Sequence, residues 1–256
     1  MRVFTLGVGR GRGGGIAARG WLVVHALASY VYSWTVMPTL EFEAEMLDRG
    51  PVVGIDEVGR GALAGPLMVG AVVVDCLSDA PRGLADSKAL TARQREQLVP
   101  LIEDWACAIA VGVATADEID AWGLRMALAV ATDRALSALC VSPSGALIDG
   151  PLDLLRPPSI MCFGDEPPDL AWSALPVLTI VKGDERAATI SAAAIVAKVR
   201  RDAFMRELHG EAPIYAWRAN KGYGSLEHRR ALAAHGPTRW HRQTWSLPEI
   251  GAEIAR

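Results

Sequence analysis

The sequence predicts an α/β fold in which a mixed β-sheet is flanked by helices and followed by a helical C-terminal region. Three observations predict it. Short apolar runs rich in β-branched residues end in acids, as at residues 52–56 and 146–149. Longer segments with helical periodicity lie between these runs, and glycine-containing turns separate the two kinds of segment. A content of 51% hydrophobic and 21% charged residues is typical of a globular chain with a sizeable core.

The elements follow one another without an internal repeat or a long linker. Apolar runs bounded by turn residues predict five strands, at residues 52–56, 67–75, 107–114, 146–149 and 175–181. Segments with one apolar face, or rich in alanine and polar helix formers, predict helices at residues 40–48, 91–104, 116–139 and 187–208. A proline-rich loop occupies residues 152–173, and the tail after residue 208 combines turns with short helices. Acids at strand ends in this order indicate a mixed sheet.

The charge balance gives no global signal for a nucleic-acid partner, because the net charge is −3. Any such contact therefore depends on a local patch. Lysine is scarce, with only four lysines against 22 arginines, and each lysine lies near an acid or in a glycine turn. These positions favour a compact ammonium group facing phosphate or carboxylate, with chance placement as the competing interpretation. The lysines are Lys88, Lys182, Lys198 and Lys221.

The four cysteines are far apart in the sequence and form no C-x-x-C pair: Cys76, Cys107, Cys140 and Cys162. This spacing argues against a zinc site and against a disulfide framework. It predicts a reducing compartment, and we expect the protein to be cytoplasmic.

Residues 1–36 form an N-terminal extension that precedes the compact pattern. Arginines flank a glycine run in this segment, and an apolar stretch follows, in an order that resembles a signal sequence. The most apolar block is short and polar residues interrupt the remainder, whereas a membrane span needs about 20 predominantly apolar residues. We therefore expect no membrane segment. We interpret the extension as disordered and Met37 as the true start, so that residues 37–256 form one domain.

Adjacent acids, Asp56 and Glu57, end the first apolar run, and the turn Gly59-Arg60-Gly61 follows at once. Glycine permits positive φ and close approach, so such a turn can present backbone N–H groups to an anion. On a regular strand the two acids would point to opposite faces, and they can share a site only if the strand ends or bends there. Paired acids beside a phosphate-sized cradle predict a divalent metal and phosphodiester chemistry. The competing interpretation is a solvated strand terminus.

Two further acids follow apolar runs. Asp149 ends the run at residues 146–149 and can lie beside the first strand, although Asp-Gly is also a common turn dipeptide. Asp184 lies just before the helix predicted at residue 187, where a helix cap is its ordinary role. Asp202 is an alternative ligand, but it lies about 27 Å farther along a straight helix, so we favour Asp184.

The segment Asn220-Lys221-Gly222-Tyr223-Gly224-Ser225 combines a lysine, an aromatic ring and two glycines. An aromatic residue in a basic glycine turn can stack on a sugar or base, a contact of roughly 1–3 kcal/mol per base. The alternative is a surface loop with a packing tyrosine.

Taken in order, these segments closely resemble ribonuclease HII, from Met37 to about Trp245. The matching segments are residues 54–66, 86–88, 148–150, 181–184, 190–202, 220–225 and 236–238 with 241–242. The resemblance implies a ribonuclease H-like fold for residues 37–256. It also implies an endonuclease that hydrolyses the RNA strand of RNA–DNA hybrids and incises at single ribonucleotides embedded in duplex DNA.

The resemblance also implies roles for individual residues. The catalytic, metal-binding acids it implies are Asp56, Glu57, Asp149 and Asp184. The substrate-binding residues it implies are Gly59, Arg60, Gly61, Ser87, Lys88, Lys182, Lys221 and Tyr223. Among these, the Gly59–Gly61 turn resembles the one that reads the ribose 2′-hydroxyl, and Tyr223 resembles the tyrosine that stacks at the junction sugar.

Four carboxylates of this kind are expected to hold two divalent cations, Mg²⁺ or Mn²⁺, because hard cations prefer oxygen ligands. The resemblance implies products with 5′-phosphate and 3′-hydroxyl ends, and we expect a monomer whose partners are RNA–DNA hybrids and ribonucleotide-containing duplexes. The alternatives are a non-catalytic nucleic-acid-binding module, a ribonuclease HIII-like enzyme and another metal-dependent phosphohydrolase. The Gly-Arg-Gly turn argues against ribonuclease HIII, which normally lacks it.

Overall fold

The computed structural model describes residues 37–157 and 166–251, and its centre is a five-stranded mixed sheet in the order β3-β2-β1-β4-β5. The strands are β1 (Val52–Val58), β2 (Leu67–Val74), β3 (Ala108–Ala114), β4 (Gly145–Asp149) and β5 (Val177–Ile180). The first three strands are antiparallel neighbours, whereas β4 lies parallel to β1 and β5 lies parallel to β4. The predicted α/β class and mixed sheet are therefore confirmed.

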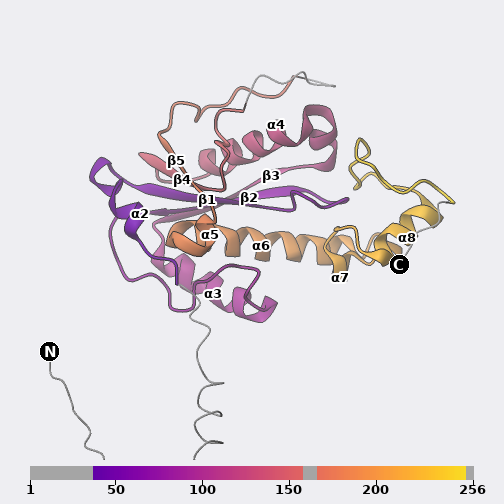
Figure 1. The fold of residues 1–256 in the computed structure, drawn as a ribbon, viewed down its shortest axis with the longest axis horizontal. Coiled ribbons are helices and arrows are strands. Elements are labelled where there is room, and N and C mark those ends of the chain that lie inside the picture. The colour runs from indigo at the N-terminus through magenta and orange to yellow at the C-terminus, as the bar shows by residue number, and fades with distance from the viewer. Residues whose placement is uncertain (1–36, 158–165, 252–256) are drawn as a thin grey trace, which may run out of the picture. The chain divides into compact units, whose positions relative to one another are not determined.

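Helices cover both faces of the sheet, which explains why β1 and β2 are apolar along nearly their whole length. One face packs against α4 (Ala116–Ser137), and the other packs against α6 (Ala188–Leu208) with α3 (Ala92–Trp105) outside it (Figure 1). Strand β3 lies at the edge and alternates buried with half-buried residues. Two buried clusters, one on each side of the sheet, form the main core.

Helix α6 lies unusually close to the sheet because the strands carry glycine beneath it. A Cβ atom on Gly54 would lie 2.3 Å from the carbonyl carbon of Thr189, and one on Gly70 would lie 2.3 Å from the carbonyl oxygen of Ala193. The start of α6 is capped from far away in the sequence, because the buried Glu43 carboxylate accepts hydrogen bonds from the Thr189 N–H (2.8 Å) and hydroxyl (2.7 Å). The helix is therefore held firmly in place against β1 and β2.

Several predicted boundaries differ from the structure. The helix predicted at residues 40–48 is split into α2 (Glu41–Ala44) and the 3-10 turn η1 (Leu47–Arg49). The strand predicted at residues 52–56 continues to Val58, and the strand predicted at 175–181 is limited to Val177–Ile180. A short helix that the sequence did not predict, α5 (Gly183–Arg186), precedes α6. Helix α4 bends at Gly123, whose φ is 74°.

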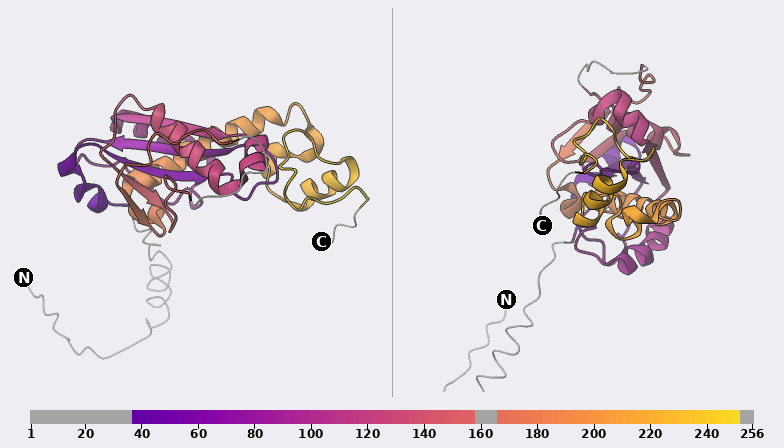
Figure 2. Two further views of the ribbon diagram at one scale, coloured as in Figure 1. Left: turned by 90° about the horizontal axis from the view of Figure 1, so that it is seen from above. Right: turned by 90° about the vertical axis from the view of Figure 1, so that its right-hand side faces the viewer.

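The C-terminal region is helical, as predicted, and lies at the end of α6 (Figure 2). It contains η2 (Pro213–Tyr215), α7 (Trp217–Asn220) and α8 (Leu226–His235). Its buried aromatic rings pack against the last turns of α6 and the segment after β1. Among the described residues, no helix has the length and apolar character needed to span a membrane. The expected N-terminal extension, residues 1–36, falls outside the described residues.

Candidate active site

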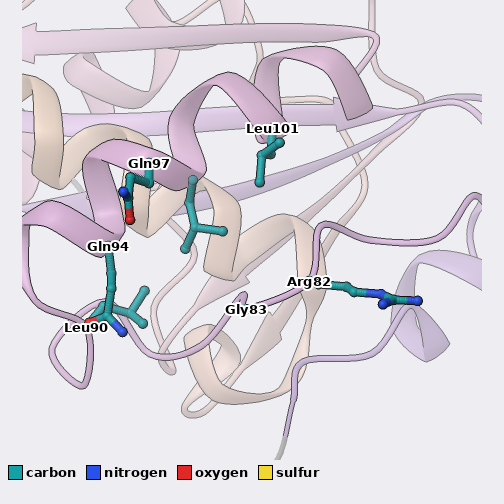
Figure 3. Close-up of a pocket in the computed structure, with 7 residues that line it drawn as sticks. Arg82, Gly83, Leu90, Gln94, Gln97 and Leu101 are labelled. Carbon is teal, nitrogen blue, oxygen red and sulfur yellow. The ribbon is translucent and has the colours of Figure 1, made fainter.

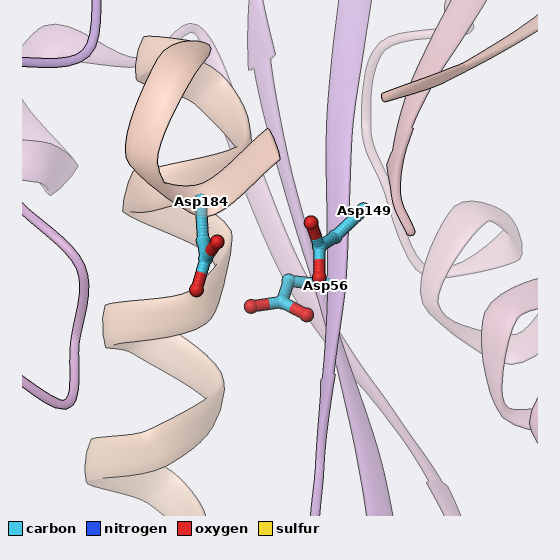
Figure 4. Close-up of side chains that lie close together, drawn as sticks. All are labelled: Asp56, Asp149 and Asp184. Carbon is cyan, nitrogen blue, oxygen red and sulfur yellow. The ribbon is translucent and has the colours of Figure 1, made fainter. Parts of the chain in front are cut away.

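Three carboxylates from separate elements meet beside β1, where the parallel strands β4 and β5 end (Figure 4). Asp56 lies on β1 and Asp149 ends the parallel strand β4, where Ile55 is paired with Ile148, so the two acids follow paired positions. Asp184 approaches from the short helix α5. One carboxylate oxygen from each residue lies within 4.8 Å of one from each of the others. We call Asp56, Asp149 and Asp184 the carboxylate cluster.

The carboxylate cluster concentrates negative charge in a buried place. Burial raises the pKa of Asp56 well above its usual value, and repulsion from Glu57, Asp149 and Asp184 raises it further. Burial and then Asp149 raise the pKa of Asp184, although the Lys88 ammonium 3.3 Å away opposes this. Such a group of like charges is stabilised by a bound cation.

Two hydrogen bonds fix the orientation of these side chains. The Gly183 N–H donates to Asp149 Oδ1 at 2.6 Å, and the Glu57 N–H donates to Asp56 Oδ1 at 2.7 Å. Asp56 and Asp149 therefore each have one oxygen held by the backbone, whereas Asp184 accepts from the Lys88 side chain at 3.3 Å. The geometry fits a hard divalent cation, because three convergent carboxylates with no competing sulfur or imidazole are the ligands such cations prefer.

Glu57 does not join the carboxylate cluster at this distance, but it lines the same cavity. Strand β1 continues regularly through Val58, so the expectation that it ends at Asp56 is wrong, and adjacent side chains diverge. The Arg60 guanidinium lies 3.5 Å from the Glu57 carboxylate. Burial raises the pKa of Glu57, while Arg60 acts in the opposite direction.

The turn after β1, residues 59–66, contributes Gly59, Arg60 and Gly61 to the lining of the cavity that also contains Asp56 and Asp149, and we call it the substrate turn. Gly59 has a φ of 87°, and a Cβ there would lie 2.2 Å from Arg201 Nε, so only glycine fits. Gly61 is exposed, and no atom lies within 4 Å of where its Cβ would be. A ligand can therefore approach the backbone closely at Gly61.

The cavity has a volume of about 430 Å³ and joins the carboxylate cluster to the substrate turn. Its lining residues are Asp56, Glu57, Val58, Gly59, Arg60, Gly61, Ser87, Lys88, Asp149, Ala194, Lys198 and Tyr223. The structure thus brings together acids that can hold a metal, lysines and a glycine turn that can contact phosphate, and an aromatic ring that can stack on a sugar or base.

Another cavity, of about 260 Å³, lies between α3 and the loop before it (Figure 3). Its lining contains no acid: Arg82, Gly83, Leu90, Gln94, Gln97, Leu98 and Leu101. It offers no ligand set for a hard cation, so the cavity that contains Asp56 and Asp149 is the candidate metal site.

Comparison with known proteins agrees with this geometry. The family model described as ribonuclease HII matches residues 53–247. The chain belongs to the ribonuclease HII family. It is 41% identical over 195 residues to ribonuclease HII of Streptomyces avermitilis, covering 76% of each chain. It is 41% identical over 209 residues to ribonuclease HII of Jannaschia, covering 82% of this chain and 95% of the relative.

Solved structures show the same fold. The ribonuclease H2 of Pyrococcus horikoshii is similar with a TM-score of 0.58 and 27% sequence identity, over 77% of this chain and 94% of that one. As a member of this family, the chain is a metal-dependent endoribonuclease of the ribonuclease H type that acts on RNA–DNA hybrids. The ribonuclease HIII-like and non-catalytic alternatives are thereby set aside.

The three lysines that the sequence predicted as substrate-binding residues lie in different surroundings, and only one of them lines the cavity. Lys88 lines the cavity and faces Asp184, beside Ser87, whose carbonyl accepts from Arg95 at 2.6 Å. Lys182 is paired instead with Glu185 at 3.1 Å, and it does not line the cavity. Lys221 donates to the Arg218 carbonyl and is also absent from the lining.

Tyr223 lines the cavity and is 37% exposed, so its ring is accessible to a ligand. The Arg201 guanidinium carbon lies 5.4 Å from the centre of this ring on its buried side. The Tyr223 carbonyl accepts a hydrogen bond from His228 Nδ1 at 2.9 Å. Tyr223 is therefore held by the hydrogen bond to its carbonyl and by the Arg201 guanidinium that packs against its ring.

Lys198 lines the cavity, although it was not predicted as a site residue. It lies one turn before Asp202 on α6, donates a hydrogen bond to that carboxylate and shares a helix face with Ala194. The scarcity of lysine was the available signal. Asp202 is bonded to Lys198 and lies 3.9 Å from Arg95, outside the carboxylate cluster.

Proposed function

We propose that this ribonuclease HII incises duplex DNA at single embedded ribonucleotides as well as cutting longer hybrids, and leaves 5′-phosphate and 3′-hydroxyl ends. One observation carries the proposal: a single cavity is lined by Asp56, Glu57 and Asp149, by the Gly59–Gly61 turn and by Tyr223. The acids would hold the metal at the position where the phosphodiester bond is cut. The turn and the aromatic ring provide two contacts close enough to recognise one sugar.

Asp56, Asp149 and Asp184 are the residues that would hold divalent cations, and we propose Glu57, which lies outside this cluster but lines the same cavity as Asp56 and Asp149, as a fourth ligand. We propose Mg²⁺ or Mn²⁺ as the metal, because all the donors are carboxylate oxygens. Divalent cations bound there supply the positive charge that activates an attacking water and balances the departing 3′-oxygen. The protein's own part is to orient Asp149 through Gly183 and to hold Lys88 near the scissile phosphate.

We propose that substrate is bound by other residues that line the cavity. Gly59, Arg60 and Gly61 present backbone groups to the sugar, Tyr223 stacks against it, and Ser87 with Lys88 contacts phosphate. Lys182 and Lys221 enter the proposal only as outer contacts with a long duplex, since neither lines the cavity.

The test is cleavage of two substrates, a duplex carrying one ribonucleotide and a long RNA–DNA hybrid, each with Mg²⁺, with Mn²⁺ and with chelator. We expect both to be cut with either metal and neither with chelator, and the product ends to be 5′-phosphate and 3′-hydroxyl. Cleavage of the long hybrid alone would contradict the single-ribonucleotide proposal.

We also propose that residues 37–256 form the nuclease domain. Residues just after Met37 belong to it structurally, because Thr39 forms a bridge with Ala187 and Glu43 bonds to Thr189. A chain that starts at Met37 should match the full chain in kcat/KM and melting temperature. A chain that starts at Pro51 should melt lower, because α6 loses the Glu43 cap. Loss of activity on starting at Met37 would contradict the proposal.

Finally, we propose a cytoplasmic monomer. All residues assigned to the site come from one chain, and the described cysteines Cys76, Cys107 and Cys140 are free thiols, which suit a reducing compartment. Light scattering during size-exclusion chromatography should give the mass of one chain, and cell fractionation should recover the activity in the cytosol. A dimer mass with activity confined to the dimer would contradict the proposal of a monomer, and activity outside the cytosol would contradict the proposed compartment.

A further inference from the structure

Two fully buried arginines lie beneath the substrate turn, Arg201 on α6 and Arg242 in the C-terminal tail. Arg242 donates to the carbonyl oxygens of Gly59 (2.6 Å), Arg60 (2.7 Å) and Gly65 (3.3 Å). Arg201 donates to the carbonyl oxygens of Pro66 (2.8 Å), Ala64 (3.2 Å) and Lys221 (2.8 Å). Five of these six acceptors belong to the substrate turn, so the turn is built on two guanidinium groups.

Neither guanidinium takes part in any of the ion pairs seen in the described part of the chain. The neighbouring acid Asp202 is paired with Lys198 instead. A buried charge without an opposite charge is costly, and a well-packed apolar side chain is often at least as stable. Burial, followed by repulsion from Arg201, lowers the pKa of Arg242 to about 10. Stability alone therefore does not account for these arginines.

Their geometry controls where the backbone N–H groups of the turn point. No peptide bond between described residues is cis, and in a trans peptide the C=O of one residue and the N–H of the next point in opposite directions. Because the Gly59 and Arg60 carbonyls point inward to Arg242, the N–H groups of Arg60 and Gly61 point outward. Both residues are exposed and line the cavity, and neither N–H is among the hydrogen-bond donors found between described residues.

We infer that Arg242 is a positioning residue for substrate selection: its forked guanidinium holds two adjacent peptide groups so that the N–H groups of Arg60 and Gly61 meet the 2′-hydroxyl side of the sugar. Arg201 supports the other end of the turn and the ring of Tyr223. The inference rests on the proposed function, since it assigns a ribose to this wall of the cavity. It explains why an arginine stands where a neutral side chain would be less costly to bury.

The test replaces the forked guanidinium of Arg242 and keeps the positive charge at that position. Lysine is a point donor that cannot bridge the Gly59 and Arg60 carbonyls, so Arg242→Lys loosens the turn without removing the positive charge. We would measure dissociation constants by fluorescence anisotropy in Mg²⁺, with the full chain carrying Asp56→Asn, for a duplex with one ribonucleotide and for the same duplex made only of DNA. The readout is the ratio of the two constants, which is independent of the folded fraction.

We expect Arg242→Lys to lower the preference for the ribonucleotide about three- to tenfold, the range of one lost hydrogen bond, with little change in affinity for the all-DNA duplex. Arg201→Lys should lower it less, because Arg201 does not contact the Gly59 or Arg60 carbonyl. The control is Arg134→Lys, which breaks comparable bonds to the Val113 carbonyl and Glu118 away from the turn. It should lower the melting temperature and leave the ratio unchanged.

A normal preference in Arg242→Lys would overturn the inference and leave the proposed function intact. A parent chain with no preference for the ribonucleotide would count against the proposed function itself. If Arg242→Lys does not fold, Arg201→Lys decides: an unchanged ratio with a lowered melting temperature would reduce both arginines to a purely structural role.

Discussion

The carboxylate cluster and the substrate turn both contribute residues to one cavity, but they are built in opposite ways. The carboxylate cluster gathers three negative charges, positioned by the pairing of parallel strands and by the short helix after β5. The substrate turn has positive charge buried beneath it and offers its own backbone to solvent. The comparison shows that a cluster of side chains can be placed by strand pairing and one short helix, whereas a turn that exposes its backbone needs side chains from distant segments to orient it.

The largest expected effect concerns the carboxylate cluster. Asp56→Asn should lower kcat by about a thousandfold or more, since an amide cannot supply the charge that a divalent cation needs and metal stabilisation is worth several kcal/mol. Asp149→Asn and Asp184→Asn should behave alike. Single-turnover cleavage in saturating Mn²⁺ is the measurement, and exposed Asp104→Asn is the matched control. If Asp202→Asn abolished cleavage while Asp184→Asn did not, the cluster would be wrongly assigned.

A smaller effect is expected at the substrate turn's aromatic neighbour. Tyr223→Ala should lower kcat/KM on a single-ribonucleotide duplex roughly 5- to 150-fold, the loss of one stacking contact of about 1–3 kcal/mol. Tyr223→Phe keeps the ring and should stay near normal. Metal affinity should not change in either variant. A collapsed melting curve, or unchanged kinetics, in Tyr223→Ala would return this residue to a packing role.

The third prediction uses the histidines behind Tyr223. The Thr238 N–H can only donate, so His241 Nδ1 accepts it at 2.9 Å, and His241 Nε2–H then donates to His228 Nε2 at 3.0 Å. His241 is therefore neutral in the folded protein, and burial lowers its pKa from 6.5 to about 4. The unfolded chain binds the proton more readily, so stability falls as pH drops from about 6.5 to about 4, by up to about 3 kcal/mol.

The measurement for this prediction is the melting temperature between pH 7 and pH 4. His241→Asn, which can still accept from Thr238, should melt with a shallower acid slope than the parent. The exposed His235→Asn is the control and should keep the parental slope. Groups with raised pKa values, such as Asp56, act in the opposite direction but cancel between parent and variant. Equal slopes in His241→Asn and parent would contradict the assignment.

The smallest expected effect is on stability at the carboxylate cluster. The raised pKa of Asp56 means that its ionised form is disfavoured in the folded state, so at neutral pH the charge destabilises the metal-free protein. Asp56→Asn should therefore melt higher in chelator, by roughly 2–4 °C for each 1 kcal/mol gained. Calorimetry with and without Mg²⁺ should also show that metal stabilises the parent more than the variant. A lower melting point in chelator would contradict the repulsion.

Sequence reasoning worked best where the determinants are local. The second strand was predicted at residues 67–75 and is Leu67–Val74, because a valine-rich run is bounded by Pro66 and an acid. The expectation that Asp56, Asp149 and Asp184 lie close together is also met, because Asp149 ends β4 beside β1 and the chain enters the helix of Asp184 soon after β5. Their catalytic roles remain predictions. The short helix at Asp184 was missed because four residues give no periodicity.

The substrate turn's supports could not be predicted in the same way. Arg242 bonds to carbonyl oxygens 177 to 183 residues earlier, and a backbone acceptor leaves no trace in residue type. Lys182 and Lys221 were grouped with Lys88 by composition, yet one is paired with a neighbouring acid and the other with its own helix end. Side-chain direction, which composition does not contain, separates them.

Helix α6 contributes residues to the cavity and also supports the substrate turn, which limits where the sequence can gain or lose residues. Ala194 and Lys198 line the cavity, and Arg201 supports the substrate turn from the same helix. Each residue inserted into a helix rotates everything beyond it by about 100° and advances it about 1.5 Å. An insertion or deletion between residues 190 and 200 would therefore turn Arg201 away from its carbonyl acceptors while Asp184 stayed in place. We expect length variation among functional homologues to be tolerated in loops such as residues 152–157 and to be absent from this helix.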